Sequence, residues 1–301
     1  MHSSEFQEHI IKTLLYYEIF DHPLSMYELF VLLSKNSITE TQFARKLAEL
    51  QSTGTIEESQ GFYKLPSNTN DVVQKRIERE HLAQHRMKIA RLMAGIIKRF
   101  PFVRGIFLSG DLSKGVAFPG SDIDYVIVTV PNRLWICRSL LILFKKIFLL
   151  NSKKYFCLNY FVAENKFTLE DQNYYTATEI AHLKPLFNFK MFRDFMNANR
   201  WVYSYFPNFT INAFLSEFND TSASALQKIL ERFFTGTWAD RLDIRLMNTM
   251  KRIWIKRYPQ YDQTTRDKIF RCTPTESCAY AGNFSDKILS LYRAKLSKYH
   301  F

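Results

Sequence analysis

The sequence predicts an α/β protein of the α+β type in three parts: a small helical module (residues 1–70), a small mixed sheet with a leading long helix (71–170), and a mostly α-helical C-terminal domain (171–301). Two observations support this prediction. Strand-like apolar runs alternate with helical patterns over residues 101–164, and proline-punctuated helical patterns fill most of residues 171–301. A chain of 301 residues, 47% hydrophobic, exceeds one typical domain and can form more than one core.

The N-terminal module fits a winged helix-turn-helix over residues 6–66. Two Ser/Thr residues are each followed three positions later by Glu or Gln, the spacing of a capping box that opens a helix. A short glycine-containing connection separates two strand-like runs, as in a wing hairpin. In order, the expected elements are a helix from Ile10 to Phe20, helices opened by Ser25–Glu28 and Thr39–Gln42, and wing strands at 55–58 and 61–65.

The charge of this module argues against duplex DNA as a partner. Residues 1–70 carry five basic and nine acidic side chains, a net charge of −4. Affinity for duplex DNA depends on neutralising phosphates, and the third predicted helix offers Arg45 and Lys46 for this task. We therefore expect a packing or protein-contact role. Residues 241–301 carry 13 basic and five acidic side chains, so an anionic partner belongs to the middle and C-terminal parts.

One long helix is expected over residues 71–100, where it would bridge the N-terminal module and the sheet. Its His81 and His85 lie four positions apart and could ligate a metal, but no Glu or Cys completes a set, so a solvated face is expected. Apolar residues near heptad spacing are expected to pack on the sheet; they are Ile77, Leu82, Ile89, Met93 and Ile96.

The strongest functional signal joins two strand-like runs. The first run, residues 103–108, ends in Ser109-Gly110, and the second opens on Asp122-Ile-Asp124. Alternate residues of a strand face the same side, so the two carboxylates are expected to project together. Such carboxylates repel unless a cation lies between them, and Mg²⁺ (or Mn²⁺) is usually held by one or two carboxylates plus substrate phosphates. An acidic strand end facing solvent is the simpler alternative, but the glycine turn favours a metal–phosphate site.

Over residues 100–130 this pattern resembles the signature of the DNA polymerase β-like nucleotidyltransferase superfamily. The order strand, turn with short helix, strand, long helix, strand over 101–164 is the order that the small mixed sheet of the nucleotidyltransferase fold requires. The resemblance implies that Asp122 and Asp124 are catalytic, metal-binding carboxylates. It also implies that Gly110 and its neighbours hold the phosphates of a nucleoside triphosphate.

Further residues near the turn are candidates for nucleotide binding. Lys114 is the nearest cation and could contact the β- or γ-phosphate, or it could be a solvated helix side chain. The hydroxyls of Ser109 and Ser121 could donate to phosphate, and turn or capping chemistry explains them equally well.

Two positions depart from the family pattern. Asp111 stands where a serine usually follows the glycine, and it places negative charge where phosphates would bind. Asn159 is the best match to the third carboxylate, which usually lies on the next core strand. An amide can orient a ligand but adds no charge. The predicted metal site therefore consists of Asp122, Asp124 and Asn159.

The resemblance implies a metal-dependent enzyme that moves a nucleoside monophosphate from a nucleoside triphosphate to a hydroxyl or phosphate of an acceptor: a small molecule, RNA or protein. The alternative is a degenerate, non-catalytic nucleotide-binding regulator or antitoxin-like interaction protein. Arg293 and His300 fit the loose spacing of helical ribonucleases that accompany small nucleotidyltransferases, a spacing that arises easily by chance. Basic C-terminal residues could line an acceptor or polyphosphate channel, or form a solvated face; they are Lys251, Arg252, Lys256, Arg257 and Arg271.

Cysteine usage and hydropathy favour a cytoplasmic protein. The four cysteines (Cys137, Cys157, Cys272 and Cys278) lack a CxxC spacing, so reduced thiols are expected. The N-terminus has no basic-then-apolar signal pattern. The most apolar stretch, residues 134–150, is shorter than the roughly 20 residues that a membrane span needs. It is expected to be a buried helix, with membrane-surface contact as the lesser alternative.

Overall fold

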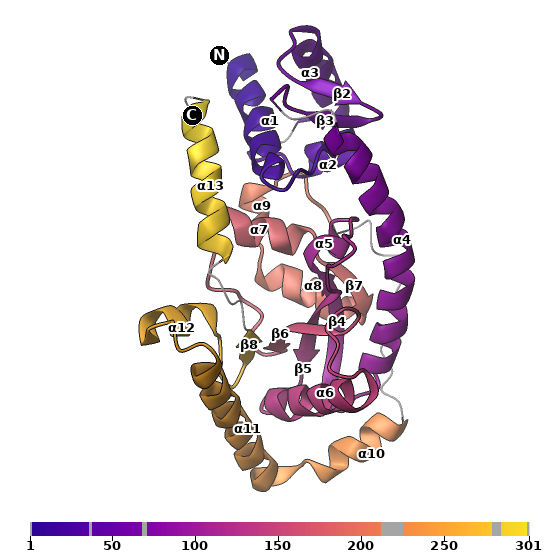
Figure 1. Ribbon diagram of the computed structural model, residues 1–301, viewed down its shortest axis with the longest axis vertical. Helices are drawn as coiled ribbons and strands as arrows, with labels where there is room; N and C mark the ends of the chain where they lie inside the picture. Colours follow the sequence, from indigo (N-terminus) through magenta and orange to yellow (C-terminus); the bar gives the residue numbers. More distant parts are fainter. Residues whose placement is uncertain (1, 36–37, 68–70, 212–224, 279–283, 300) are drawn as a thin grey trace.

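The computed structural model describes residues 2–35, 38–67, 71–211, 225–278, 284–299 and 301. Within them, 13 helices and two small sheets form an elongated molecule, and the predicted α+β class is confirmed. The N-terminal helices lie at one end, next to the C-terminal helix α13 (Phe284–Lys298) (Figure 1). At the opposite end lie α10 (Ala225–Phe233) and the first turns of α11 (Gly236–Arg257) (Figure 1).

The N-terminal module contains three helices and a three-stranded antiparallel sheet of order β1-β3-β2. Both expected capping boxes are present: the hydroxyls of Ser25 and Thr39 accept hydrogen bonds from the backbone N–H of Glu28 and Gln42. The first helix starts earlier than expected, at His2. The elements are α1 (His2–Glu18), β1 (Leu24–Ser25), α2 (Met26–Val31), α3 (Glu40–Ser52), β2 (Glu57–Ser59) and β3 (Phe62–Lys64).

The long helix α4 (Asp71–Ile97) runs along one side of the molecule (Figure 1). Of the expected apolar residues, Leu82, Ile89 and Met93 are half-buried and pack against the core, and three alanines next to them are buried more deeply: Ala83, Ala90 and Ala94. Small side chains let the helix approach closely, and the long apolar side chains flank the contact. Arg76 is also buried, with its guanidinium 2.7 Å from Glu28.

The central sheet has five strands in the order β7-β4-β5-β6-β8. Strands β4 and β5 are antiparallel, and β5 and β6 are parallel. The end of β4, which leads into Gly110, therefore lies next to the start of β5, which carries Asp124. The edge strands β7 and β8 were not expected, because each is short and lies within a segment that reads as helical. The bounds are β4 (Val103–Ser109), β5 (Asp124–Thr129), β6 (Cys157–Ala163), β7 (Lys184–Phe187) and β8 (Glu276–Cys278).

Helices cover both faces of this sheet. Alternate residues separate the cores: Phe107 and Val126 join the core that continues into the N-terminal module, whereas Ile106 and Ile127 join the core under α4, α6 and α11. The remaining helices are α5 (Gly110–Ser113), α6 (Leu134–Phe148), α7 (Tyr174–Ala181), α8 (Phe189–Ala198), α9 (Val202–Tyr205) and α12 (Gln263–Ile269).

The apolar segment 134–150 is a helix, but its second half is not buried as expected. Leu134 and Leu141 are buried, whereas Phe148 and Leu150 are exposed. No helix in the described part of the chain is both long and apolar enough to cross a membrane. The four cysteines all lie within the described residues and form no disulfide.

Candidate functional site

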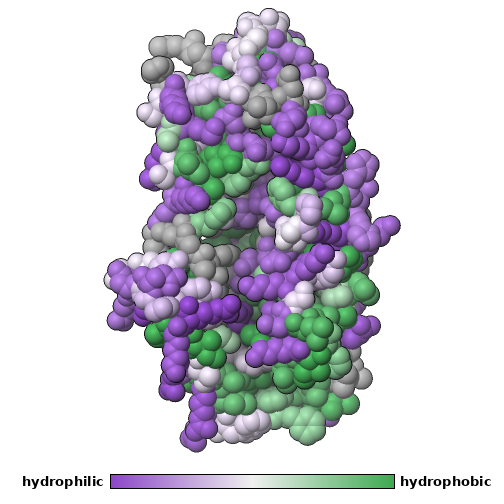
Figure 2. All heavy atoms as spheres, in the orientation of Figure 1, coloured by the Kyte–Doolittle hydropathy of each residue, from purple (hydrophilic) through white to green (hydrophobic). Residues whose placement is uncertain are grey.

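A cavity of about 380 Å³ lies where the N-terminal helices, the sheet edge and α7 meet. Its wall comes from α1, the β4–α5 turn, β5, β6, α7, the segment 169–173 and the start of α13. Figure 2 shows a hollow near mid-height, at the level of α7 and the adjoining end of the sheet in Figure 1. The cavity therefore collects residues from all three sequence-predicted parts of the chain.

The turn after β4 is held against the carboxylate of Asp124. Ser109 pairs with Asp124 across the β4–β5 ladder, and the chain then turns at Gly110 with φ +68°. A Cβ built at position 110 would lie 2.6 Å from Oδ2 of Asp124. Glycine is required here for two reasons, the positive φ and the close carboxylate. The peptide groups of the turn and this carboxylate thus share one small space.

Asp124 is the first residue of β5 and lines the cavity. Burial raises the pKa of its carboxyl to about 6, and the neighbouring carboxylates of Asp122 and Asp111 act in the same direction. The hydrogen bond from the Cys157 thiol, across the parallel β5–β6 pair, opposes this shift of the pKa. A carboxylate that is both buried and close to like charges is stabilised by a cation.

Asp122 does not share the strand with Asp124 as expected. Strand β5 begins at Asp124, and Asp122 is not among the residues that line the cavity, although it is close enough to raise the pKa of Asp124. The turn before it is tied to α4: the Arg86 guanidinium donates to the Ser121 hydroxyl (2.9 Å) and to the carbonyl of Pro119 (2.7 Å). The Ser121 hydroxyl is therefore part of the turn, and Ser121 does not line the cavity.

Two charged side chains beside the turn also line the cavity. Burial raises the pKa of the Asp111 carboxyl, an effect that the Lys114 ammonium partly offsets. Lys114 is not a solvated side chain, because its Nζ lies 2.8 Å from Oε1 of Glu179 on α7 and it is 17% exposed. Glu179 was not singled out in the sequence, since no motif surrounds it and only the packing of α7 brings it here.

Asn159 reaches the cavity through an irregularity in β6. Tyr125 pairs with Leu158 and Val126 pairs with Tyr160, so Asn159 is an extra residue between them, a β-bulge. Of the sequence-predicted site residues, the structure brings six to one cavity: Ser109, Gly110, Asp111, Lys114, Asp124 and Asn159.

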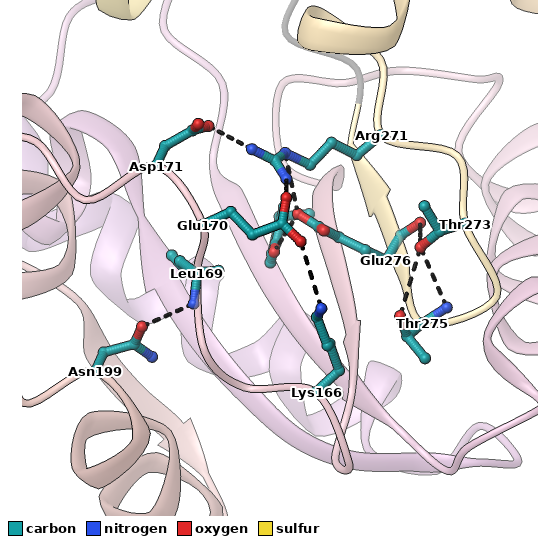
Figure 3. Close-up of polar contacts among 10 residues, drawn as sticks. Lys166, Leu169, Glu170, Asp171, Asn199, Arg271, Thr273, Thr275 and Glu276 are labelled. Atoms are coloured by element: carbon teal, nitrogen blue, oxygen red, sulfur yellow. Dashed lines mark hydrogen bonds and ion pairs between the residues drawn. The ribbon is translucent and has the colours of Figure 1, made fainter.

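A second charged cluster, not expected from the sequence, lies on the same cavity. The Arg271 guanidinium is 2.5 Å from Asp171, 3.3 Å from Glu170 and 3.4 Å from Glu276 (Figure 3). The Tyr160 hydroxyl donates to Glu276 at 2.7 Å. Sequence reasoning named Arg271 but missed its partners, because Glu170 and Asp171 are about 100 residues away and pair with it only in the folded chain.

The other basic C-terminal candidates do not reach the cavity. Lys251, Arg252, Lys256 and Arg257 are exposed on α11, as a solvated basic face would be. Arg293 is exposed on α13, and His300 lies outside the described residues. Among the described residues, no group of three His, Cys, Asp or Glu side chains is placed to hold a metal ion.

Compared with known proteins, the chain matches no protein-family model, no curated protein and no solved structure.

Proposed function

We propose that this protein is a metal-dependent nucleotidyltransferase, which moves a nucleoside monophosphate from a nucleoside triphosphate to an acceptor. The observation that carries the proposal is the close approach of the Asp124 carboxylate to Gly110 in the turn after β4. A single triphosphate could contact both the backbone N–H groups of this turn and a metal ion on the carboxylate, as the sequence resemblance implies. The N-terminal elements would then be a winged helix-turn-helix module that packs on the enzyme, since α1 and the sheet share one core.

The residues at this edge of the sheet fit Mg²⁺ or Mn²⁺. Asp124 has a raised pKa because burial and the neighbouring carboxylates Asp122 and Asp111 disfavour its charge, and a divalent cation relieves that cost. Mg²⁺ needs no more than one or two protein carboxylates when phosphates and water complete its shell, so the lack of a three-residue group among the described side chains is compatible with it. Asp124 and Asp122 would hold the ion, with the Asn159 amide beside them.

The roles of the other residues follow from their contacts. When bound, the metal ion would supply positive charge to the transferring phosphoryl group. The turn at Gly110 presents its peptide N–H groups to phosphate oxygens. The Lys114 ammonium, now paired with Glu179, would exchange that carboxylate for a β- or γ-phosphate oxygen. Asp111 would oppose triphosphate binding by like-charge repulsion.

The same site in a non-catalytic, nucleotide-binding regulator is the second candidate. It is favoured by the uncharged Asn159 in the place of a third carboxylate, because a site with two carboxylates can bind a metal–nucleotide complex without holding a second ion. Pyrophosphate release separates the two candidates, since binding alone leaves the triphosphate intact.

The decisive experiment incubates the full chain with each α-labelled triphosphate, Mg²⁺ and a cell extract. An enzyme labels an acceptor and releases pyrophosphate, and Asp124→Asn abolishes both. Asp194→Asn on α8 is the matched control and keeps full activity. The Asp194 carboxylate lies 2.8 Å from the Lys190 ammonium, and Asp194 does not line the cavity. Mg²⁺-dependent triphosphate binding without pyrophosphate release supports the regulator. Absence of any triphosphate binding rules out both candidates.

A further inference from the structure

The charge of the cavity is opposite to that of the chain. The chain carries a formal net charge of +12. Among the described residues that line the cavity there are seven carboxylates and two cationic side chains, a difference of 7 − 2 = 5 negative charges. His22 also lines it, but burial and the Arg76 guanidinium lower the pKa of its imidazole well below the usual value, so it stays neutral. Among the described side chains that line it, the cavity therefore has more carboxylates than cations.

Six of the seven carboxylates form two groups, and the seventh is Asp286 at the start of α13. Asp111 and Asp124 lie at the Gly110 turn, and Glu179 is the third carboxylate that acts on the pKa of both. We call these three the turn acids. Their cation is Lys114, paired with Glu179. In the proposed nucleotidyl transfer, this part of the cavity is taken by the metal and the triphosphate.

The second group, which we call the loop acids, consists of Glu170, Asp171 and Glu276. All three surround one guanidinium, that of Arg271 (Figure 3). The loop acids come from the segment before α7 and from β8, whereas the turn acids come from α5, β5 and α7. Lys166 also pairs with Glu170 at 3.4 Å (Figure 3), so three carboxylates face two cations and the group keeps a surplus of one negative charge.

The wall of the cavity adds groups that favour an organic cation. The rings of Tyr175 and Phe284 meet edge to face with centroids 6.1 Å apart at the cavity, and aromatic rings attract ammonium groups. The Tyr16 side chain is 1% exposed and lines the cavity, and its hydroxyl has no hydrogen-bond partner among the residues that the structure describes. A buried hydroxyl of this kind gains a partner when a polar ligand enters.

From these observations we propose that the loop acids bind the acceptor of the reaction, and that this acceptor is a small molecule carrying one or more amines near the hydroxyl that is modified. Arg271 occupies the loop acids until the amine replaces it. The role of this molecule as the acceptor rests on the proposed function, whereas the binding of a cation to the loop acids does not. An RNA acceptor is disfavoured, because its phosphates would meet seven carboxylates.

The transfer needs no reactant other than the nucleoside triphosphate and the acceptor. The acceptor's hydroxyl oxygen forms a bond to the α-phosphorus while the bond from that phosphorus to the bridging oxygen breaks. Pyrophosphate leaves with the electron pair of the broken bond, and the hydroxyl proton passes to solvent. The loop acids take no part in these bond changes; they hold the amine and so orient the hydroxyl.

Binding of spermidine, a flexible trication, to the full chain tests the cation site without nucleotide. Calorimetry at physiological salt should detect spermidine binding, and azelate, a dianion of similar length, should not bind. The double variant Glu170→Gln/Asp171→Asn should weaken spermidine binding about tenfold, because removing two charges from a partly solvated site costs on the order of 1.4 kcal/mol.

The matched control is Asp71→Asn/Glu78→Gln on α4. Asp71 is 56% exposed and 2.5 Å from Lys75, as Asp171 is 59% exposed and 2.5 Å from Arg271, and Glu78 is exposed like Glu170. This control should leave spermidine affinity unchanged. Equal losses in both double variants would show a non-specific charge effect and overturn the proposal, as would tighter binding of azelate than of spermidine.

Arg271→Gln gives a result of opposite sign. If Arg271 competes with the ligand for the loop acids, its removal should tighten spermidine binding several-fold, whereas an anion-binding Arg271 would leave spermidine unaffected and make triphosphate binding weaker. The latter result overturns the proposal. Should this variant fail to fold, the Glu170→Gln/Asp171→Asn result decides alone.

Asp124→Asn separates this inference from the proposed function. It should abolish transfer and leave spermidine binding intact. Spermidine binding by a wild-type protein that transfers no nucleotide would contradict the proposed function alone. Transfer to a neutral acceptor, with no spermidine binding, would contradict the cation site alone.

Discussion

The Asp124 carboxylate occupies the space that a side chain at Gly110 would need, with its Oδ2 2.6 Å from the position of a Cβ. The glycine turn and the carboxylate are therefore one unit, although 14 positions separate them in the sequence. This unit depends on the antiparallel pairing of Ser109 with Asp124, which sets the register of β4 against β5. A substitution at Gly110 should therefore displace the Asp124 carboxylate.

Gly110→Ala should abolish triphosphate binding and lower stability. The substitution forces a Cβ into a residue with φ +68°, which costs about 1–2 kcal/mol, and it also displaces the Asp124 carboxylate. Gly115→Ala is the matched control, because its φ is +77° and a Cβ there meets nothing within 4 Å. We expect the control to lose a similar amount of stability in urea unfolding and to retain nucleotide affinity. Equal affinity losses in both variants would show that backbone strain, not the carboxylate contact, matters.

The pKa of Asp124 makes stability depend on pH in a defined direction. The folded-state pKa is about 6, above the ordinary value of 3.8, so the folded state binds the proton more tightly. This carboxyl therefore costs stability above pH 6, and the cost disappears as pH falls from 6 towards 3.8. Asp124→Asn should raise the free energy of unfolding by about 3 kcal/mol at pH 8 and by much less at pH 4.5. Urea unfolding of both proteins at the two pH values tests this, and a pH-independent difference would contradict it.

Asp111→Ser should tighten triphosphate binding about tenfold, because it removes one like charge from a partly solvated site, worth on the order of 1–2 kcal/mol. In an active enzyme, the change should mainly lower the KM for triphosphate. Asp111→Asn, which keeps the shape and removes the charge, should behave in the same way. Loss of Mg²⁺-dependent binding in both variants would show instead that Asp111 ligates the metal.

The N-terminal module should contribute little to the binding of duplex DNA by the full chain at physiological salt. The Lys46 Nζ lies 2.8 Å from Glu49 and the residue is 8% exposed, so on α3 it is not available to a phosphate. Electrophoretic mobility shifts at increasing salt measure this. Any weak binding should survive Arg45→Ala and disappear with Arg245→Glu/Arg252→Glu on the exposed basic face of α11. Tight, steeply salt-dependent binding that Arg45→Ala removes would contradict the charge argument.

The sequence predicted correctly those helix starts that depend on residues close together in the chain. Ser25 and Thr39 open their helices as expected because capping depends on residues three positions apart. The expected apolar face of α4 packs against the core through Leu82, Ile89 and Met93, but the neighbouring alanines are buried more deeply, because the partners of the helix and not its heptad-like pattern decide the depth of burial. Strand β8 has three residues, too few for a pattern, and it exists because it pairs with β6.

The same distinction applies to the cavity. Gly110 and Asp124 belong to one continuous motif, so the sequence could indicate them. Glu179 comes from α7, Glu170 and Asp171 come from the segment before it, and Glu276 comes from β8. No spacing in the sequence relates these residues to the turn. Only long-range packing places them, which is why the acidic character of the cavity was not predicted from a chain that is basic overall.

Asn159→Asp should restore a third carboxylate, because the bulge in β6 already brings this side chain to the cavity with Asp124. The added negative charge should tighten binding of Mn²⁺ or Mg²⁺ more than binding of the triphosphate, since it attracts the cation and repels the phosphates. It should also raise the pKa of Asp124 further, so that metal binding is lost at a higher pH than in the wild type as the solution is acidified. Calorimetric titration with Mn²⁺ at pH 7.5 and pH 6, in the presence and absence of a triphosphate, measures each effect. If metal affinity is unchanged at both pH values, position 159 does not belong to the metal site, and the two carboxylates Asp122 and Asp124 act without it.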